Sequence, residues 1–571
     1  MKTITTRTPG GFFGFLRKHP YLLTILICMV LLPFSYADRA RITTTGCILL
    51  GAGAAIAAVA VIFCFHFGKT TSEKIILSII CSFCAAAAVL VICLVDNKAV
   101  AIAAVALIVA IIAAVFIKIN FELNDTVVIA VLILLGVTIR FVYVLYTSAA
   151  DRQHDVGTWG GTAGHTAYIE YWNNNGFKLP DFDVRNYWQF YHPPLHHWLM
   201  ATLLSVLSAL SVPYPTACEA LQILPMLYSS LVMIVSYRIF RLIKLSGKPL
   251  IAAMAIVCFH PTFILFGGAF NNDMLLMLFV MSAIMWGLRW FREPVMKNII
   301  PLALCIGLGM MTKLSGWMVA PAVAFLFLYI LIKNIKKPLR YIGQYAVFGV
   351  ICVPLGLWWQ VRNLLLFKVP LTYVPNLGTG SEMYSGNMSV AQRLFDFGNG
   401  QLSYVYDAIT LIGGPYNEYN PTVGLFKTAM FDEGTKSINN INFPQITVTG
   451  PILFWLSVAL FLISFVCFVI MMIKKSKDIT GAERIYFSLI FAVHLISYYM
   501  FCFSYPFSCT LNIRYCMPLI PLCAMGLGMM LKSTENSTKP AATAFRRFMY
   551  VLTAAFCGMS YLVYTQVGFT I

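Results

Sequence analysis

An acidic residue, Asp155, lies shortly after a long apolar run, in the stretch DRQHDVGTWGGTAGHTAYIEYW at residues 151–172. A carboxylate at a membrane surface is partly desolvated, and desolvation makes it a stronger base. Such a group suits general-base catalysis, in which it takes a proton from a hydroxyl. Asp155 is therefore a candidate for a catalytic role, although its position alone favours an ordinary loop residue.

Three histidines, His192, His196 and His197, fall within six residues of the segment QFYHPPLHHWL. Such a density suggests metal ligation, but no Cys or carboxylate stands at a paired helical spacing that would complete a zinc site. Contact with an anionic head group, or packing at the membrane interface, fits the segment better. The two adjacent prolines favour a rigid lead-in to the helix that follows.

Cationic side chains recur at the ends of later apolar runs. Lys313, in MMTKLSGW, lies between two such runs, where a charge is costly and therefore indicates function. Arg362 in WWQVRN and Arg514 in LNIRYCMPLIPL stand at run ends, where each alone could be a snorkelling side chain. Together with His192, these three cations could surround a lipid-borne phosphate, because a phosphate needs cationic donors at the membrane edge.

Two further motifs carry carboxylates. FNNDMLL places Asn272 and Asp273 at the start of an apolar run, where Asp273 alternatively caps a helix. DFD, at residues 181–183, resembles the metal-binding pair of nucleotide-sugar transferases. A single motif of this kind is a weak signal, and we expect it to face a compartment without nucleotide sugars.

The composition indicates a membrane protein. Of the 571 residues, 60% are hydrophobic and only 11% are charged, whereas a soluble domain has about 25% charged residues. Apolar runs of roughly 20 residues recur along the chain, and each is long enough to cross the bilayer as a helix. They predict an all-α, polytopic transmembrane bundle of about fifteen spans. The net charge of +18 is scattered in short loops, which favours a topological role over nucleic-acid binding.

The placement of residues 193–211 decides the topology. The segment either spans the membrane or lies flat at the interface. If it lies flat, most basic clusters and the N-terminus fall on the cytoplasmic side, as the positive-inside rule prefers. We therefore expect the loop 148–218 and the polar segment 363–450 outside the cytoplasm, the latter as a lid or small subdomain.

Six features follow one another along the chain: the acidic outer loop, YHPPLHHWL, FNNDMLL, MMTKLSGW, WWQVRN and RYCMPLIPL. In this order they resemble the GT-C superfamily of integral-membrane glycosyltransferases. The branches with the strongest resemblance are the protein O-mannosyltransferases (glycosyltransferase family 39) and the lipid A aminoarabinose transferase. The resemblance covers roughly residues 121–370 and 451–531. It implies that a sugar passes from a polyprenyl-phosphate carrier to an acceptor outside the cytoplasm, typically with inversion at the anomeric carbon.

The resemblance also implies roles for single residues. The family's catalytic carboxylate corresponds to Asp155, and its basic residue before the outer-loop proline corresponds to His192. Its buried lysine corresponds to Lys313, and its late Arg–Tyr pair corresponds to Arg514 and Tyr515. With Arg362, these basic residues and Tyr515 are expected to bind the donor phosphate.

The chain departs from the family pattern in the acidic loop, where QHDV replaces the common adjacent Asp–Glu pair. This departure leaves Asp151 as a rival catalytic base. Substrate binding is assigned to Asn272, Asp273 and His196. No metal site is assigned and no cofactor is certain; a divalent metal stays open because family members differ.

Four parts follow from this pattern: an N-terminal four-span extension at 1–120, a catalytic core at 121–362 that includes the outer loop 148–218, an extracytoplasmic loop or lid at 363–450, and C-terminal transmembrane helices at 451–571. We expect a multi-pass plasma-membrane protein whose N-terminus is cytoplasmic and whose active site faces outward. Its partners would be membrane lipid, a polyprenyl-phosphate sugar donor and a protein, lipid or wall-polymer acceptor, but not nucleic acid.

Other functions remain open from the sequence. The chain could transport or flip a lipid-linked sugar, transfer a whole glycan as a ligase, or serve as a non-catalytic assembly subunit. A transporter would carry charges near mid-membrane and two similar halves. No clear internal repeat is visible, and the polar residues gather on one predicted face.

Overall fold

The computed structural model describes residues 125–147, 155–398, 402, 418–433 and 446–566. The predicted extension at 1–120 lies outside these ranges. Within them the chain forms helices and no β-strand, apart from one isolated bridge between Tyr384 and Phe507. The predicted all-α fold is confirmed.

The α-helices follow one another along the described chain, with both short turns and longer loops between them. They are α6 (Asp125–Tyr146), α7 (Gly164–Asn174), α8 (Leu195–Ala209), α9 (Tyr214–Ala220), α10 (Ile223–Leu242), α11 (Gly247–Phe259), α12 (Pro261–Leu265), α13 (Asp273–Arg292), α14 (Met296–Thr312), α15 (Ala320–Lys333), α16 (Leu339–Phe367), α17 (Val390–Phe395), α18 (Pro421–Phe431), α20 (Ile446–Ile473), α21 (Gly481–Ser504), α22 (Leu519–Thr534) and α23 (Pro540–Gln566).

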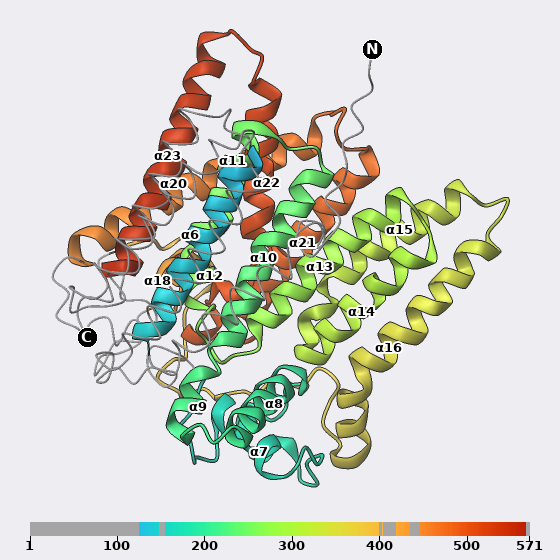
Figure 1. Ribbon diagram of the computed structural model, residues 1–571, viewed down its shortest axis with the longest axis vertical. Helices are drawn as coiled ribbons and strands as arrows, with labels where there is room; N and C mark the ends of the chain where they lie inside the picture. Colours follow the sequence, from blue (N-terminus) through green and yellow to red (C-terminus); the bar gives the residue numbers. More distant parts are fainter. Residues whose placement is uncertain (1–124, 148–154, 399–401, 403–417, 434–445, 567–571) are drawn as a thin grey trace, which may run out of the picture.

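Eight helical segments of the described chain are long and apolar enough to cross a membrane, which makes the chain an integral membrane protein. The sequence predicts apolar runs beyond residue 125 near 126–147, 219–243, 250–268, 273–291, 297–312, 316–334, 341–360, 451–473, 484–503, 514–531 and 547–566. Each of them forms helix over most of its length. Helix α8 has 15 residues and is among the shorter apolar helices. It packs against α7, and both lie with α9 at one end of the bundle (Figure 1).

Two predicted runs are interrupted by proline. The run at 250–268 divides into α11 and α12, because Pro261 cannot continue the hydrogen-bond ladder of α11. The run predicted at 514–531 begins its α-helix only after Pro518. Residues 513–515 instead form a short 3-10 turn. Arg514 therefore lies in a connection, where its side chain can turn toward other segments.

The long helices pack in two groups around α6, α10 and α11 (Figure 1). On one side α10 contacts α13, α13 contacts α14, and α14 contacts α16. On the other side α11 contacts α22, α22 contacts α20, and α20 contacts α23.

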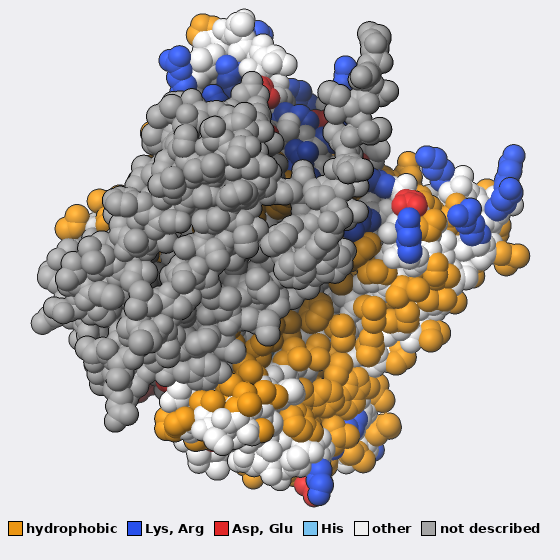
Figure 2. Space-filling model, in the orientation of Figure 1, with side chains coloured by type: hydrophobic (Ala, Val, Ile, Leu, Met, Phe, Trp, Pro, Cys, Tyr) orange, Lys and Arg blue, Asp and Glu red, His pale blue; other side chains and the backbone are white. Residues whose placement is uncertain are grey.

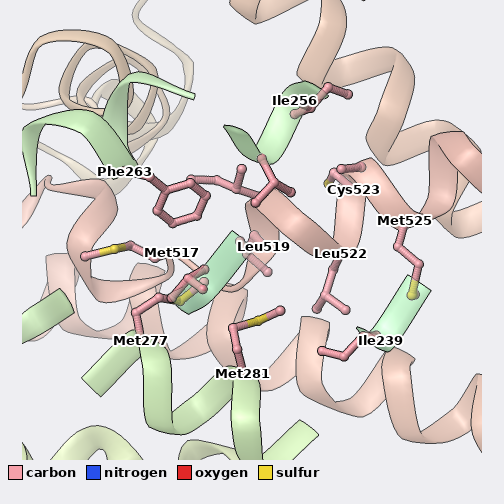
Figure 3. Packing of buried hydrophobic residues seen from close by; sticks show 14 of the residues in the cluster. Ile239, Ile256, Phe263, Met277, Met281, Met517, Leu519, Leu522, Cys523 and Met525 are labelled. Carbon is pink, nitrogen blue, oxygen red and sulfur yellow. The ribbon is translucent and has the colours of Figure 1, made fainter. Parts of the chain in front are cut away.

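The core between the two groups is apolar and rich in methionine and leucine (Figure 3). Met277 and Met281 of α13 lie in the same cluster as Leu522 of α22 and Ile239 of α10. The flexible thioether side chain of methionine fills irregular gaps between helices that cross. This packing fixes the helix ends that carry the polar residues described below.

A fully buried arginine joins three of the central helices. Arg140 of α6 donates from Nε to Ser229 Oγ at 2.7 Å and from Nη1 to the carbonyls of Gly136 and Cys258 at 2.7 and 2.8 Å. The Cys258 carbonyl lies in the last turn of α11, which has no intrahelical partners left. Arg140 therefore donates a hydrogen bond to a carbonyl that has no intrahelical partner, because α11 ends before Pro261.

Helices α20 and α22 are in close contact at a glycine. A Cβ added to Gly526 would lie 2.4 Å from the Cα of Phe468. On α23, a Cβ added to Gly558 would meet no atom within 4 Å. The two glycines therefore make a matched pair for testing the packing.

We expect Gly526→Ala to lower the free energy of unfolding by about 1–3 kcal/mol, because the added methyl group forces α20 and α22 apart. Gly558→Ala should instead be neutral or stabilising by up to about 1 kcal/mol, since alanine favours a helix over glycine. Thermal unfolding of both variants in detergent measures the difference. A midpoint for Gly526→Ala at or above that of Gly558→Ala would contradict the packing described here.

Candidate functional site

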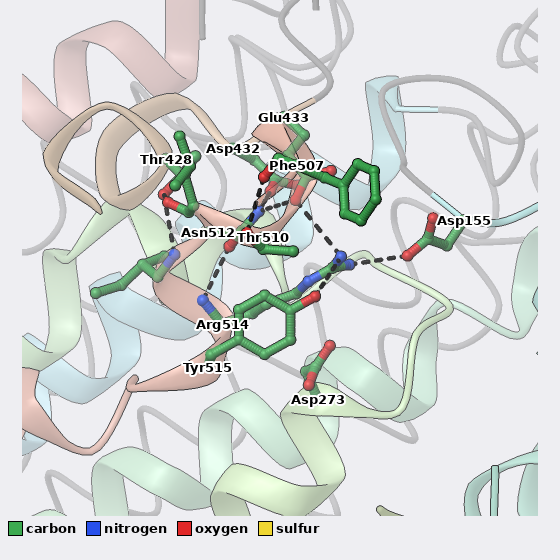
Figure 4. A network of polar contacts seen from close by, with 12 residues as sticks. Asp155, Asp273, Thr428, Asp432, Glu433, Phe507, Thr510, Asn512, Arg514 and Tyr515 are labelled. Carbon is green, nitrogen blue, oxygen red and sulfur yellow. Dashed lines mark hydrogen bonds and ion pairs between the residues drawn. The ribbon is translucent and has the colours of Figure 1, made fainter. Parts of the chain in front are cut away.

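Polar side chains from segments far apart in the sequence meet around the 3-10 turn at residues 513–515 (Figure 4). Asp155 comes from the loop before α7, and Asp273 from the start of α13. Asp432 and Glu433 come from the end of α18. The site therefore forms at the ends of helices, where the main chain can turn and side chains can converge.

Asp155 forms an ion pair with Arg514, in which Nη1 lies 3.0 Å from Oδ2. Asp155 has a φ of 60°, a left-handed backbone conformation that is costly for a residue with a Cβ. Its carbonyl accepts the N–H of His165 at 3.1 Å, which ties the loop to the first turn of α7. A Cβ at Gly164 would lie 2.5 Å from the carbonyl oxygen of Val156, so only glycine permits this close contact.

Arg514 has contacts beyond Asp155. Its Nη2 donates to the Tyr515 hydroxyl at 3.0 Å and lies 3.5 Å from Glu433 Oε1. Its Nε is buried and has no hydrogen-bond partner among the described residues. Burial alone would lower the pKa of Arg514, but Tyr515, Glu433, Asp155 and Asp273 together raise this pKa above its usual value. The guanidinium is therefore a permanent cation whose Nε–H has no partner among the described residues.

A second ion pair lies beside the first. Lys313 Nζ is 2.5 Å from Asp273 Oδ1 and 5.1 Å from the centre of the Tyr515 ring. Asp273 is the first residue of α13, where the helix dipole favours a negative charge. Asn272 holds the two helix ends together, because its Nδ2 donates to the carbonyl of Thr312 at 2.9 Å. Tyr515 thus contacts both cations of the site.

Three site residues were absent from the sequence prediction. The Nδ2 of Asn512, which is fully buried, donates to Asp432 Oδ1 at 2.8 Å and to Glu433 Oε1 at 2.7 Å. The Oδ1 of Asn512 accepts the backbone N–H of Arg514 at 2.9 Å. Within the predicted 363–450 lid, the adjacent acids in MFDEG follow an apolar stretch. This pattern was the available sequence signal for Asp432 and Glu433.

The histidines form a buried group next to these pairs. His165 Nδ1 and His197 Nε2 share a hydrogen bond of 2.9 Å, and the His192 ring stacks on His165 with 6.0 Å between ring centres. Burial, together with the nearby charge of Lys313, lowers the pKa of His192 well below its usual value. His192 therefore lies near Lys313 and Arg514 in its neutral form.

His196 and Asn272, both predicted to bind substrate, are occupied by contacts with main-chain carbonyls. His196 is completely buried, and its Nε2 lies 2.8 Å from the carbonyl oxygen of Phe270. This contact joins α8 to the turn before α13. Both residues support the position of Asp273 in this arrangement.

Arg362 lies elsewhere. Its Nη1 donates to Asn363 Oδ1 at 2.8 Å, its Nη2 donates to the Pro180 carbonyl, and its guanidinium stacks on Trp359 at 5.4 Å. These contacts connect the end of α16 to the outer loop. The structure does not bring Arg362 into the group that surrounds Arg514.

The remaining predicted acids have other positions. Asp151 lies outside the described residues. In the DFD motif, Asp183 caps a short 3-10 turn and pairs with Arg185 at 2.5 Å. Within the described ranges, no three His, Cys, Asp or Glu side chains are arranged to hold a metal ion.

Residues 191–359 match the family model described as dolichyl-phosphate-mannose-protein mannosyltransferase. The match confirms the resemblance that the motifs predicted, and it supports sugar transfer by a glycosyltransferase as the class of activity. It includes His192, Asp273 and Lys313. Asp155 and Arg514 lie outside the matched region and enter the site only through the fold.

Similar solved structures include ArnT from Cupriavidus metallidurans in the apo state, with 13% identity and a TM-score of 0.42 over 77% of this chain and 76% of that chain. The archaeal oligosaccharyltransferase AglB from Archaeoglobus fulgidus, in complex with an inhibitory peptide and a dolichol-phosphate, has 12% identity and a TM-score of 0.42 over 77% of this chain and 55% of that chain. At these values the likeness carries no argument. No curated protein matches the sequence.

We expect the buried His196 to make stability depend on pH. Burial lowers its folded-state pKa to about 4 from an ordinary 6.5, so the unfolded chain takes up the proton first. The resulting stability is present above pH 6.5 and is lost as the pH falls toward 4. The loss amounts to about 3 kcal/mol at most, since one pKa unit is worth about 1.4 kcal/mol.

The variant His196→Gln can keep the contact with Phe270 but cannot titrate. Thermal unfolding measured from pH 7 to pH 4 should therefore show a smaller loss of stability for the variant than for the natural protein. Equal pH dependence in both proteins would show that His196 does not contribute.

Proposed function

We propose that the chain transfers a sugar from a polyprenyl-phosphate donor to a hydroxyl of an extracytoplasmic acceptor, with inversion at the anomeric carbon. The observation that carries the proposal is the pairing of Asp155 with Arg514, next to Lys313 and Asp273. A candidate base and two cations thus lie in one largely buried group, and the matched family is one of sugar transferases.

In this reaction the acceptor oxygen attacks the anomeric carbon while the bond from that carbon to the phosphate oxygen breaks. Asp155 accepts the hydroxyl proton as general base. The negative charge that develops on the departing lipid phosphate is stabilised by Arg514 and Lys313. Preorganised cations are effective here, because a buried site is poor in water that could screen them.

Binding of the donor requires an exchange of partners. Both cations are paired with carboxylates, Asp155 and Asp273, in the structure. The Nε of Arg514 is buried without a partner among the described residues, so it can donate to the phosphate once the exchange has opened the group. Lys313, whose side chain is 16% exposed, can then turn from Asp273 to the phosphate. His192 stays neutral beside them and can donate a hydrogen bond without adding charge.

The distribution of basic residues supports an outward-facing site. Lys and Arg gather toward the end of the molecule opposite α7, α8 and α9, with a broad apolar surface between (Figures 1 and 2). The segment from the last residue of α15 to the first turn of α16 carries four exposed basic residues, Lys333, Lys336, Lys337 and Arg340. By the positive-inside rule that end is cytoplasmic, and the Asp155 end faces outward across the plasma membrane.

The sugar and the acceptor are further parts of the proposal. The description of the matched family specifies mannose and a protein acceptor. We take mannose as the first sugar to test, with protein, lipid and wall polymer as the acceptor classes. The rival proposals are a transporter or flippase for the lipid-linked sugar and a whole-glycan ligase.

We expect Asp155→Asn to reduce sugar transfer about 10²- to 10⁴-fold, because an amide cannot accept the acceptor proton. The amide oxygen still accepts a hydrogen bond from Arg514, so donor binding should persist. The measurement follows transfer of label from polyprenyl-phosphate mannose to protein, lipid and polymer fractions in membranes that contain the chain.

The matched control is Asp183→Asn, which neutralises an acid of the same outer region whose side chain is 25% exposed, close to that of Asp155. Its ion pair with Arg185 is a surface contact, so near-normal transfer is expected. Normal transfer by Asp155→Asn would exclude Asp155 as the base. Donor movement across the membrane without any transfer would favour the transporter.

A further inference from the structure

We propose that Glu433 is a second functional carboxylate of this site, which shares Arg514 with Asp155 and so keeps Asp155 effective as a base. Glu433 is a positioning residue in this proposal, because it acts on the acceptor proton through Arg514. The inference rests on the proposed function. It adds a contribution from the segment 418–433, which the sequence prediction treated only as part of a lid.

The geometry places Arg514 between the two carboxylates (Figure 4). Nη1 lies 3.0 Å from Asp155 Oδ2, and Nη2 lies 3.5 Å from Glu433 Oε1. Coulomb attraction varies inversely with distance, so both carboxylates attract the guanidinium with similar strength. The Glu433 side chain is 5% exposed and that of Asp155 is 24% exposed. Solvent therefore screens the contact with Glu433 less.

Glu433 is held firmly by the surrounding chain. Asn512 bonds both Asp432 and Glu433, and Asp432 has a φ of 57°, outside the range preferred by residues with a Cβ. Such strain persists only where neighbouring contacts impose it, and it often marks functional positions. Thr428 adds a contact to the same turn, because its Oγ1 accepts the backbone N–H of Ile513 at 2.9 Å.

A separate ion pair anchors the other end of the segment. Lys427 and Glu418 are both buried and contact each other directly. Ser508 Oγ donates to the carbonyl of Glu418 at 2.8 Å, which docks the segment on the connection before α22. This anchor has no direct contact with the guanidinium of Arg514, so it offers a control within the same segment.

The sharing of Arg514 affects proton transfer. A carboxylate bound by an arginine alone favours its charged form more strongly than one that shares the arginine. It is consequently a weaker base, and general-base catalysis loses driving force. Glu433 withdraws part of the guanidinium charge from Asp155 and limits this loss.

Several other groups face the pair and bear on any pH dependence. Those identified by contact or electrostatic interaction within the described residues are Tyr191 before α8, His192 at the same connection, Asp273 at the start of α13, Lys313 after α14, Asp432 after α18, and Cys509 and Tyr515 before α22. All of these groups are retained in a Glu433 variant, so a difference between the variant and the natural protein reports the loss of the Glu433 charge.

The test replaces Glu433 by Gln, which keeps the shape of the side chain and its acceptor for Asn512. The full-length protein in lipid nanodiscs is assayed with polyprenyl-phosphate mannose across the pH range. We expect the acidic limb of the kcat/KM profile to move to lower pH by about one unit, since Asp155 then holds Arg514 alone. The plateau kcat should fall roughly three- to tenfold.

Two further variants separate this effect from damage to the segment. Glu418→Gln removes the charge of the anchoring ion pair with Lys427 and should lower thermal stability without moving the acidic limb. Glu433→Asp restores the charge and should return the limb toward that of the natural protein. An unmoved limb in Glu433→Gln, or the same profile in Glu433→Gln and Glu418→Gln, would overturn the proposal.

A readout without substrate distinguishes this inference from the proposed function. Infrared difference spectra follow protonation of the Asp155 carboxyl, assigned by its loss in Asp155→Asn. A lower protonation midpoint in Glu433→Gln, without sugar transfer by the natural protein, would support the sharing of Arg514 but refute the function. Transfer with an unchanged midpoint would refute the sharing alone.

Discussion

The ion pair between Asp155 and Arg514 is the constraint on which the site depends. The two residues are 359 positions apart in the sequence, and the arginine is almost completely buried. A buried charge that loses its partner is strongly destabilising, so the fold must bring both residues to the same place. The neighbouring pair of Lys313 and Asp273 obeys the same requirement. The result is a group of charges arranged before any ligand arrives.

The site occupies the ends of helices because only there is the main chain free to turn. Asp273 begins α13, Lys313 follows α14, and Arg514 precedes α22. Within a span the backbone must satisfy its own hydrogen bonds, and irregular chain is tolerated only inside the protein or along a cavity. The connections at these ends are held by side chains such as Asn512, which bonds both main chain and carboxylates.

Much of the fold could be predicted because a span of roughly 20 apolar residues is visible in any sequence. Helix ends near proline were harder to predict. Helix α22 begins only after Pro518, so Arg514 lies outside it. Arg362 and Arg514 have the same local pattern, an arginine at the end of an apolar run, yet only Arg514 meets the acids. That distinction depends on contacts between distant segments. Glu433 was not predicted for the same reason, because its partner Arg514 is distant in the sequence and no local motif identifies it.

The buried Arg140 has a consequence for biogenesis. An arginine near the middle of a single helix costs about 2.5–3.5 kcal/mol during insertion into the bilayer, which the rest of a strongly apolar helix can offset. The Gly136 carbonyl lies on α6 itself, but the other two acceptors, Ser229 and the Cys258 carbonyl, are synthesised only later, on α10 and α11. Helix α6 therefore enters the lipid with N–H groups of Arg140 that lack acceptors. Packing of α10 and α11 against α6 supplies these acceptors, which favours this arrangement of the three helices.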